Sequence, residues 1–442
     1  MIQNIIRSLL ESMIRPIDSI IFLVIFILLI ISNIFNSKLE LFVQISLYII
    51  YIFFNLYINP KKFLWYFCPI FFLSINLIGV FLIEFFEGYY LFEIGRITYY
   101  KDSLFPIVLY TLIIIYILFG IKLKNINIKK RENKLIDKFI FILLILSILI
   151  FLKVVQKPIF MLNIDKYKYS KEYLNFSIQS LINIYQYYLP LFFGYIYITT
   201  TSPRTRRNIM IINILMILTL IFIGVKFGGI FYYSYYFLLP VVLKLKVKKI
   251  ILRKIFRGLI AVIILIIFSI SHRILNYNLS MSEGIKGFLN RGFQQGQLWW
   301  ATYLNKDMIY NEFILSEILN DNEKTRGIYK VMYSLGKHEF IDKLYQIKSV
   351  YTASTTSTLY AYFGIKGIYI FSLIYGILIL KSYQLIIQSI KKNLWINLII
   401  ITRIMVILTS IFSISKFYIL NILEGIILLI LVQIVILKKE KE

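Results

Sequence analysis

The chain has 442 residues, of which 59% are hydrophobic, 17% are aromatic and 16% are charged. A soluble globular domain is about half apolar and a quarter charged, so this composition excludes an ordinary soluble fold. The formal net charge is +27, but the Lys and Arg residues cluster in short segments between apolar runs, which indicates membrane topology rather than nucleic-acid binding.

The apolar runs predict an all-α, polytopic membrane protein that forms one integral domain over residues 1–442. Each run of about 18 or more apolar residues can cross a bilayer core of roughly 30 Å, whereas strands of an outer-membrane barrel would be short and alternating. The first residues, "MIQNIIRSLLESMIRP", are amphipathic and are expected on the membrane surface. About twelve spans follow, at residues 17–35, 39–58, 63–83, 104–121, 138–155, 179–199, 208–225, 228–243, 256–272, 357–380, 394–414 and 417–437.

The basic residues predict the orientation of these spans. With a cytoplasmic N-terminus, the cytoplasmic segments are "NPKK", "KLKNINIKKRENKLIDK", "SPRTRR", "KLKVKKIILRKIFR", "KSYQLIIQSIKK" and "KKEKE". Together with Arg7 and Arg15 they hold 27 of the 49 Lys and Arg residues. Excess positive charge marks the cytoplasmic side, so both termini are expected there.

Residues 273–356, between spans nine and ten, are then expected on the outer face. This segment holds ten basic and eight acidic residues together with many aromatic and aliphatic ones. Connections longer than about 15 residues are usually functional or disordered, and this composition is too apolar for disorder. We expect a folded cap of short helices.

The stretch "FLNRGFQQGQLWWATYL", residues 288–304, concentrates polar and aromatic side chains. On one helix, Arg291, Gln294 and Gln295 would share a face bordered by Trp299 and Tyr303. Such a set suits a phosphate or an array of sugar hydroxyls. The alternative is an interfacial helix whose aromatic residues and arginine only anchor the protein. As substrate-binding candidates this stretch supplies Gln294, Gln295, Gln297, Trp299, Trp300 and Tyr303.

Two further candidates in this segment could act on a substrate. Arg273 lies where span nine leaves the membrane, although positive residues often end a span. His338 could serve as a general base, and Asp342, four residues later, could orient its ring on a helix. The alternative for His338 is a surface position on an amphipathic helix.

The boundary of span ten is rich in hydroxyl groups. Residues 349–369 read "SVYTASTTSTLYAYFGIKGIY", and Tyr351, Thr355 and Thr356 could line a polar entrance. Hydroxyls at the start of a helix can also serve only as caps.

Two charges lie inside apolar runs, Arg403 and Glu424. Ionisable groups at such depth are costly and usually mark a partner or a pathway. Either the two residues form an ion pair, or Arg403 binds a lipid-linked phosphate. The chain's one cysteine and two histidines show no metal-ligand spacing, so no metal and no cofactor is expected.

The predicted chain resembles the Wzy-type polymerases of O-antigen and capsular polysaccharide. The features that carry the resemblance are twelve spans, cytoplasmic ends, one large late outer segment with "RGFQQGQLWW", and "STTSTLYAYFGIKG" at the start of the next span. In some members a periplasmic arginine is followed by ten residues and a glycine, as Arg273 is by Gly284. The resemblance implies a GT-C-like glycosyltransferase in the bacterial inner membrane, which joins oligosaccharide repeat units carried on undecaprenyl diphosphate. It also implies a chain-length regulator and a flippase as pathway partners.

This chemistry fits the candidate residues. The leaving group is a diphosphate, so cationic donors such as Arg291 and Arg273 would stabilise it without a metal. His338 or a carboxylate of the same segment would take the proton of the acceptor hydroxyl. A lipid-linked oligosaccharide flippase and a related O-antigen ligase are the alternatives, and a flippase would be expected to have short loops on both faces.

Overall fold

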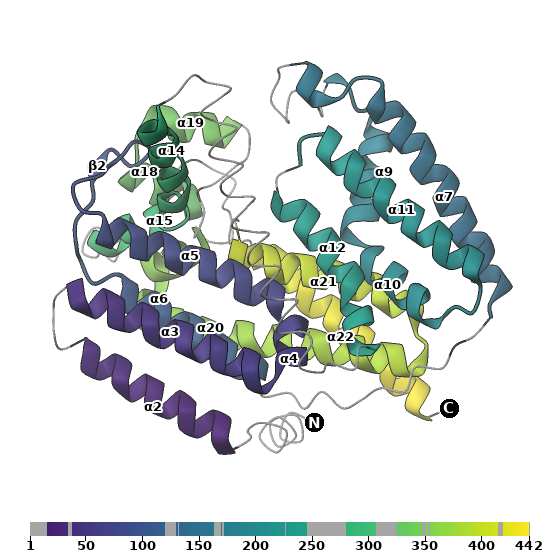
Figure 1. The fold of residues 1–442 in the computed structure, drawn as a ribbon, viewed down its shortest axis with the longest axis horizontal. Coiled ribbons are helices and arrows are strands. Elements are labelled where there is room, and N and C mark those ends of the chain that lie inside the picture. The colour runs from purple at the N-terminus through teal and green to yellow at the C-terminus, as the bar shows by residue number, and fades with distance from the viewer. Residues whose placement is uncertain are drawn as a thin grey trace. The chain divides into compact units, whose positions relative to one another are not determined.

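The computed structural model describes residues 16–33, 38–119, 130, 132–162, 169, 172–225, 227–244, 280–305, 324, 326–346, 351, 354–413 and 419–441. These residues are almost entirely helical, which confirms the all-α prediction (Figure 1). The chain divides into two compact units. Unit 1 comprises Met1–Leu123, Lys246–Leu380 and Thr409–Leu420, and unit 2 comprises Lys124–Leu245, Lys381–Leu408 and Asn421–Glu442.

Unit 1 begins with apolar helices and continues with a short hairpin. Its first elements are α2 (Pro16–Ser32), α3 (Lys38–Ile58), α4 (Pro60–Trp65), α5 (Phe67–Phe85), β1 (Tyr90–Leu91), β2 (Arg96–Ile97) and α6 (Leu104–Phe119). The two strands are antiparallel, with Tyr90 opposite Ile97. Helices α3, α5 and α6 contact one another. Their ends therefore bring the α5–α6 connection close to the start of α3.

The second part of unit 1 comes from the predicted outer segment. It contains α14 (Met281–Phe293), α15 (Gln297–Leu304), α18 (Gly327–Leu335), α19 (His338–Gln346) and the first part of α20 (Ser354–Lys392). Helices α14 and α15 contact α5, and α15 contacts α18. The expected short helices are therefore present, and α14 and α15 pack on α5, which is long and apolar enough to cross a membrane. Helix α20 carries a kink at Gly364, where φ is 66°, a conformation that glycine adopts without steric cost.

Unit 2 contains α7 (Lys134–Val155), the 3-10 turn η1 (Ile159–Met161), α9 (Phe176–Tyr187), α10 (Pro190–Thr199), α11 (Pro203–Phe222) and α12 (Phe227–Lys244). It also contains the end of α20, α21 (Trp395–Ser413) as far as Leu408, and α22 (Ile419–Lys441) from Asn421 onward. Predicted span six is two helices, because Pro190 begins α10 at a position that Pro favours. The Asn133 side chain caps α7 by accepting from the backbone N–H groups of Leu135 and Ile136.

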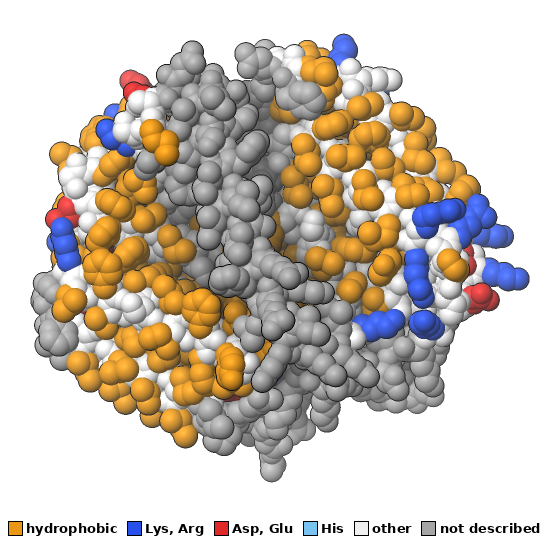
Figure 2. Space-filling model, in the orientation of Figure 1, with side chains coloured by type: hydrophobic (Ala, Val, Ile, Leu, Met, Phe, Trp, Pro, Cys, Tyr) orange, Lys and Arg blue, Asp and Glu red, His pale blue; other side chains and the backbone are white. Residues whose placement is uncertain are grey.

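Five described helices are long and apolar enough to cross a membrane: Lys38–Ile58, Phe67–Phe85, Lys134–Val155, Pro203–Phe222 and Thr355–Lys392. Shorter apolar helices cover Asp18–Ser32, Leu104–Phe119, Pro190–Thr199 and Trp395–Thr409. Where α7 and α11 lie in Figure 2, hydrophobic side chains cover the surface and Lys and Arg gather at one end. These features fit a membrane protein, while the number of twelve spans stays a prediction. Span nine, 256–272, lies outside the described residues.

Candidate functional site

The stretch at residues 288–304 is not one helix, as the sequence predicted, but two. Helix α14 ends at Phe293 and α15 begins at Gln297, with a turn between them. The turn brings Gly296 against the backbone of Gly79 and Val80 in α5: a Cβ on Gly79 would lie 2.6 Å from the Gly296 nitrogen. The single helix expected over residues 288–304 is therefore wrong, because the chain turns where Gly296 packs against the backbone of α5.

The polar residues of this turn converge on Glu93, at the tip of the β1–β2 hairpin. The Gln294 side-chain amide donates to Glu93 Oε1 at 2.8 Å, and the Gln297 amide donates to Glu93 Oε2. Arg291 donates through Nη1 to Gln294 Oε1 at 3.1 Å. The Arg291 side chain is exposed. A chain of hydrogen bonds from Glu93 through Gln294 therefore orients an exposed guanidinium.

Gln295 turns back on its own helix. Its side-chain amide donates to the Arg291 carbonyl oxygen at 3.2 Å. Gln295 therefore helps to end α14.

The two tryptophans are structural anchors in this conformation. Both are fully buried, and their indole N–H groups donate to backbone carbonyls of the α5–α6 connection, Trp299 to Ser103 at 2.8 Å and Trp300 to Tyr99 at 3.2 Å. Buried Trp usually finds such a partner. Because both rings are buried, a sugar could not contact them in this conformation. Sugar binding by Trp299 and Trp300 stays a prediction.

Close to the Ser103 carbonyl that Trp299 bonds, three carboxyl groups from different parts of unit 1 come together. Glu40 lies in the first turn of α3, Glu84 in the last turn of α5, and Asp102 just before α6. Tyr100 donates its hydroxyl to Glu40 Oε2 at 2.9 Å, and the Ser103 backbone N–H donates to Glu84 Oε1 at 2.7 Å. Both glutamates are fully buried, whereas Asp102 is half-buried.

Burial, followed by the nearby charges of Glu40 and Glu84, raises the pKa of Asp102 to about 7. The same carboxyl groups act on Tyr303 of α15. Burial first, and then the charges of Asp102, Glu84 and Glu40, raise the pKa of its phenol to about 12. Tyr303 is half-buried and packs against Trp299. The candidate site of unit 1 therefore combines an oriented arginine, a titratable carboxyl group and a tyrosine.

Three further candidates lie between the predicted outer segment and the start of α20. Tyr351 is buried and donates to the Glu93 carbonyl oxygen at 3.3 Å. Thr355 and Thr356 are buried in the first turn of α20. A polar entrance at these threonines stays a prediction.

His338 starts α19 and is exposed. Its Nε2 atom lies 3.0 Å from the Tyr333 carbonyl oxygen. The carboxylate of Asp342 instead accepts from Lys324 at 2.6 Å and from the Tyr333 hydroxyl, and these bonds lower its pKa. The expectation that Asp342 orients the ring is therefore wrong, because nearer donors hold this carboxylate.

Arg403 belongs to unit 2, where its Nε lies 3.3 Å from Glu424 Oε1. Its guanidinium also lies over the Tyr188 ring, 5.8 Å from the centroid. The ion-pair interpretation is confirmed, and binding of a lipid-linked phosphate by Arg403 stays a prediction. Arg273 lies outside the described residues.

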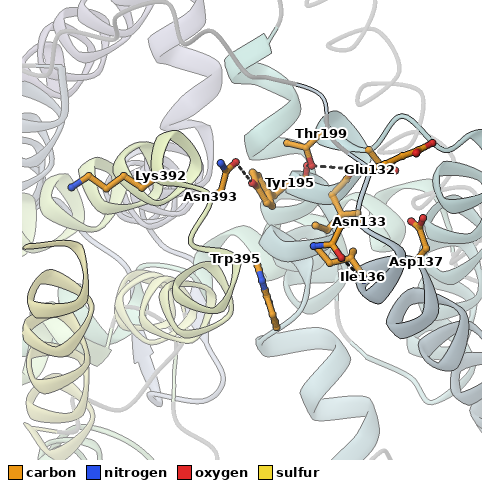
Figure 3. A pocket seen from close by; sticks show the side chains of 11 residues that line it. Glu132, Asn133, Ile136, Asp137, Tyr195, Thr199, Lys392, Asn393 and Trp395 are labelled. Atoms are coloured by element: carbon orange, nitrogen blue, oxygen red, sulfur yellow. Dashed lines mark hydrogen bonds between the residues drawn. The ribbon is translucent and has the colours of Figure 1, made fainter. Parts of the chain in front are cut away.

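Unit 2 also holds a cavity of about 600 Å³ (Figure 3). Its walls come from the start of α7, the end of α10 and the α20–α21 turn, and they include Glu132, Asp137, Thr199, Lys392 and Trp395. The Tyr195 hydroxyl donates to Asn393 Oδ1 at 2.8 Å across one wall. No candidate residue from the sequence lines this cavity.

The sequence reasoning missed Glu93 and the three carboxyl groups. A usable signal was present: Glu40, Glu84 and Asp102 all lie at predicted outer ends of spans two, three and four. Acidic residues at three ends on one side of a membrane are candidates for a common site.

A family model described as a family of unknown function (DUF6418) matches residues 321–430. This range takes in α18, α19, α20 and α21. No curated protein and no solved structure matches the chain.

Proposed function

We propose that this chain is a polysaccharide polymerase of the bacterial inner membrane. It joins oligosaccharide repeat units carried on undecaprenyl diphosphate at the outer face, with both chain termini in the cytoplasm. The apolar helices and the folded segment docked on them support this proposal.

The arrangement of unit 1 supports a site at one membrane surface. Segment 281–305 packs on the end of α5 and bonds to the α5–α6 connection. Helix ends that meet the same extramembrane segment lie on the same side of a bilayer, and the distribution of Lys and Arg assigns that side to the exterior.

The oriented Arg291 guanidinium carries the proposal. Transfer of a glycan from a lipid diphosphate needs donors that stabilise the developing negative charge, and a pre-oriented guanidinium supplies two of them in one plane. The hydrogen bonds from Glu93 through Gln294 hold Arg291 before any ligand arrives, which reduces the ordering cost of binding.

The test compares Arg291→Lys and Arg291→Ala with Lys286→Ala, a matched control, since Lys286 is also exposed on α14. The purified protein is given lipid-linked repeat units, and the polymer is measured on a gel. We expect both Arg291 variants to lose about 10²–10³ in rate, because lysine cannot form the bidentate contact, and the control to keep its rate.

A normal rate for Arg291→Ala at normal protein level would contradict the role of Arg291. Deletion of the gene tests the class of function. A surface glycan with single repeat units supports a polymerase, and loss of all surface repeats supports a flippase instead.

A further inference from the structure

The carboxyl group of Asp102 differs from its two acidic neighbours in how accessible it is. Glu40 and Glu84 are fully buried, while Asp102 is half-buried in the connection that precedes α6. Its backbone φ is 57°, a left-handed conformation that Asp and Asn tolerate better than most residues. The accessible carboxyl group of the cluster is therefore the one on a turn.

Two buried acceptor atoms beside Asp102 indicate a ligand that donates hydrogen bonds. Oε2 of Glu84 and Oε1 of Gln44 have no hydrogen-bond partner among the described residues. Both side chains are fully buried. Buried acceptors without donors are costly, and sugar hydroxyl groups would supply such donors. Among the described residues no group of His, Cys, Asp and Glu is arranged to hold a metal ion.

We propose that Asp102 is the general base that accepts the proton of the acceptor sugar hydroxyl, and that the sugar, when it displaces the side chains that cover Glu84 and Gln44, donates hydrogen bonds to both. This inference rests on the proposed polymerase function and adds the residue that activates the acceptor.

The acceptor oxygen forms a bond to the anomeric carbon of the donor glycan, and its proton passes to the Asp102 carboxylate. The bond from that carbon to the diphosphate oxygen breaks, and the electron pair leaves with the diphosphate. Asp102 then releases the proton to water.

The surroundings of Asp102 suit a base at neutral pH. Five titratable groups interact electrostatically with Asp102, each from a different element of unit 1: Glu40, Glu84, Tyr100, Tyr303 and Tyr369. Burial and the two glutamates hold the pKa of Asp102 at about 7. The ionised base form therefore increases as the pH rises through neutrality, and activity should rise with it.

The experiment uses the full-length protein in vesicles with lipid-linked repeat units and follows polymer formation against pH. Asp102→Asn keeps the left-handed turn and removes the base, so we expect a loss of about 10²–10⁴ in rate at every pH. Glu40→Gln removes one negative neighbour, so the pH at which activity rises should move lower. Glu87→Gln is the matched control: Glu87 is exposed on the same connection, paired with Lys38 at 2.9 Å, and its loss should leave the rate unchanged.

A second readout needs no activity. A hydrophobic carbodiimide modifies protonated carboxyl groups, so its labelling of Asp102, read by mass spectrometry, should fall between about pH 5 and about pH 9. The fall should move to lower pH in Glu40→Gln. Constant labelling over this range overturns the titration of Asp102.

The two proposals fail in different ways. If the wild type is active and the Asp102→Asn variant is equally active, Asp102 is not the general base, and the proposed polymerase function is unaffected. If the wild type makes no polymer from any lipid-linked repeat unit, the proposed polymerase function is contradicted, and so is the role of Asp102 as its general base.

Discussion

The contact between Gly296 and α5 allows a sharp test of how the outer segment is attached. A Cβ added at Gly296 would collide with the Val80 backbone nitrogen and would lie 2.6 Å from the Gly79 carbonyl carbon. This is about 1 Å short of ordinary van der Waals contact. Both neighbours are backbone atoms and cannot rotate away. Gly296→Ala must therefore separate α15 from α5, and we expect a cost of about 1–3 kcal/mol in the free energy of unfolding.

Two other glycines provide graded controls. A Cβ at Gly292 would meet only the Leu82 Cδ1 atom, at 2.7 Å, and this end of a side chain can move. A Cβ at Gly425 would lie 3.9 Å from Ile407, in ordinary contact. Gly292→Ala should therefore cost less than Gly296→Ala. Gly425→Ala should be neutral or stabilising by roughly 0.5–1 kcal/mol, because alanine favours the helix.

The chain contains its own reporter for this measurement. Cys68 is the single cysteine, and it is buried in α5, the helix that Gly296 contacts. A fluorogenic maleimide reacts with Cys68 only when α5 is exposed, so the temperature of labelling in mild detergent ranks the variants. Equal labelling temperatures for Gly296→Ala and wild type would refute the backbone contact.

Two further predictions concern a hydrogen-bonded pair and a charged pair, and a third concerns the orientation of the chain. Glu93→Ala should release the Gln294 amide, lower the temperature of thiol labelling and weaken polymer formation, whereas wild-type behaviour would mean that the hairpin does not hold the segment. Arg403→Ala and Glu424→Ala should each reduce folded protein more than the double variant does, with a coupling of about 0.5–3 kcal/mol, and additive losses would exclude the pair. A cysteine placed at Asn305 in a cysteine-free background should react with an impermeant thiol reagent on intact spheroplasts, and protection until lysis would reverse the assigned orientation.

The sequence by itself was enough to predict the all-α fold. Long apolar runs indicate helices that can cross a bilayer, and clustered basic residues predict their orientation; both are local properties of the chain. The pairing of Arg403 with Glu424 was one of two interpretations that the sequence allowed, because a charge inside an apolar run favours a partner of opposite sign. The short helices of the outer segment followed from its mixture of apolar and polar residues.

Only the tertiary structure decided which residues share a site. Helical periodicity placed Arg291 beside Gln294, and the two share a hydrogen bond, but it continued the helix to Leu304, whereas the contact of Gly296 with Gly79 marks a turn before Gln297. Glu93 lies about two hundred positions before its glutamine partners, at a sequence separation of 201 from Gln294. The meeting of Asp102 with Glu40 depends on how α3, α5 and α6 pack. Such contacts arise from packing between distant segments, and local spacing carries no information about that packing.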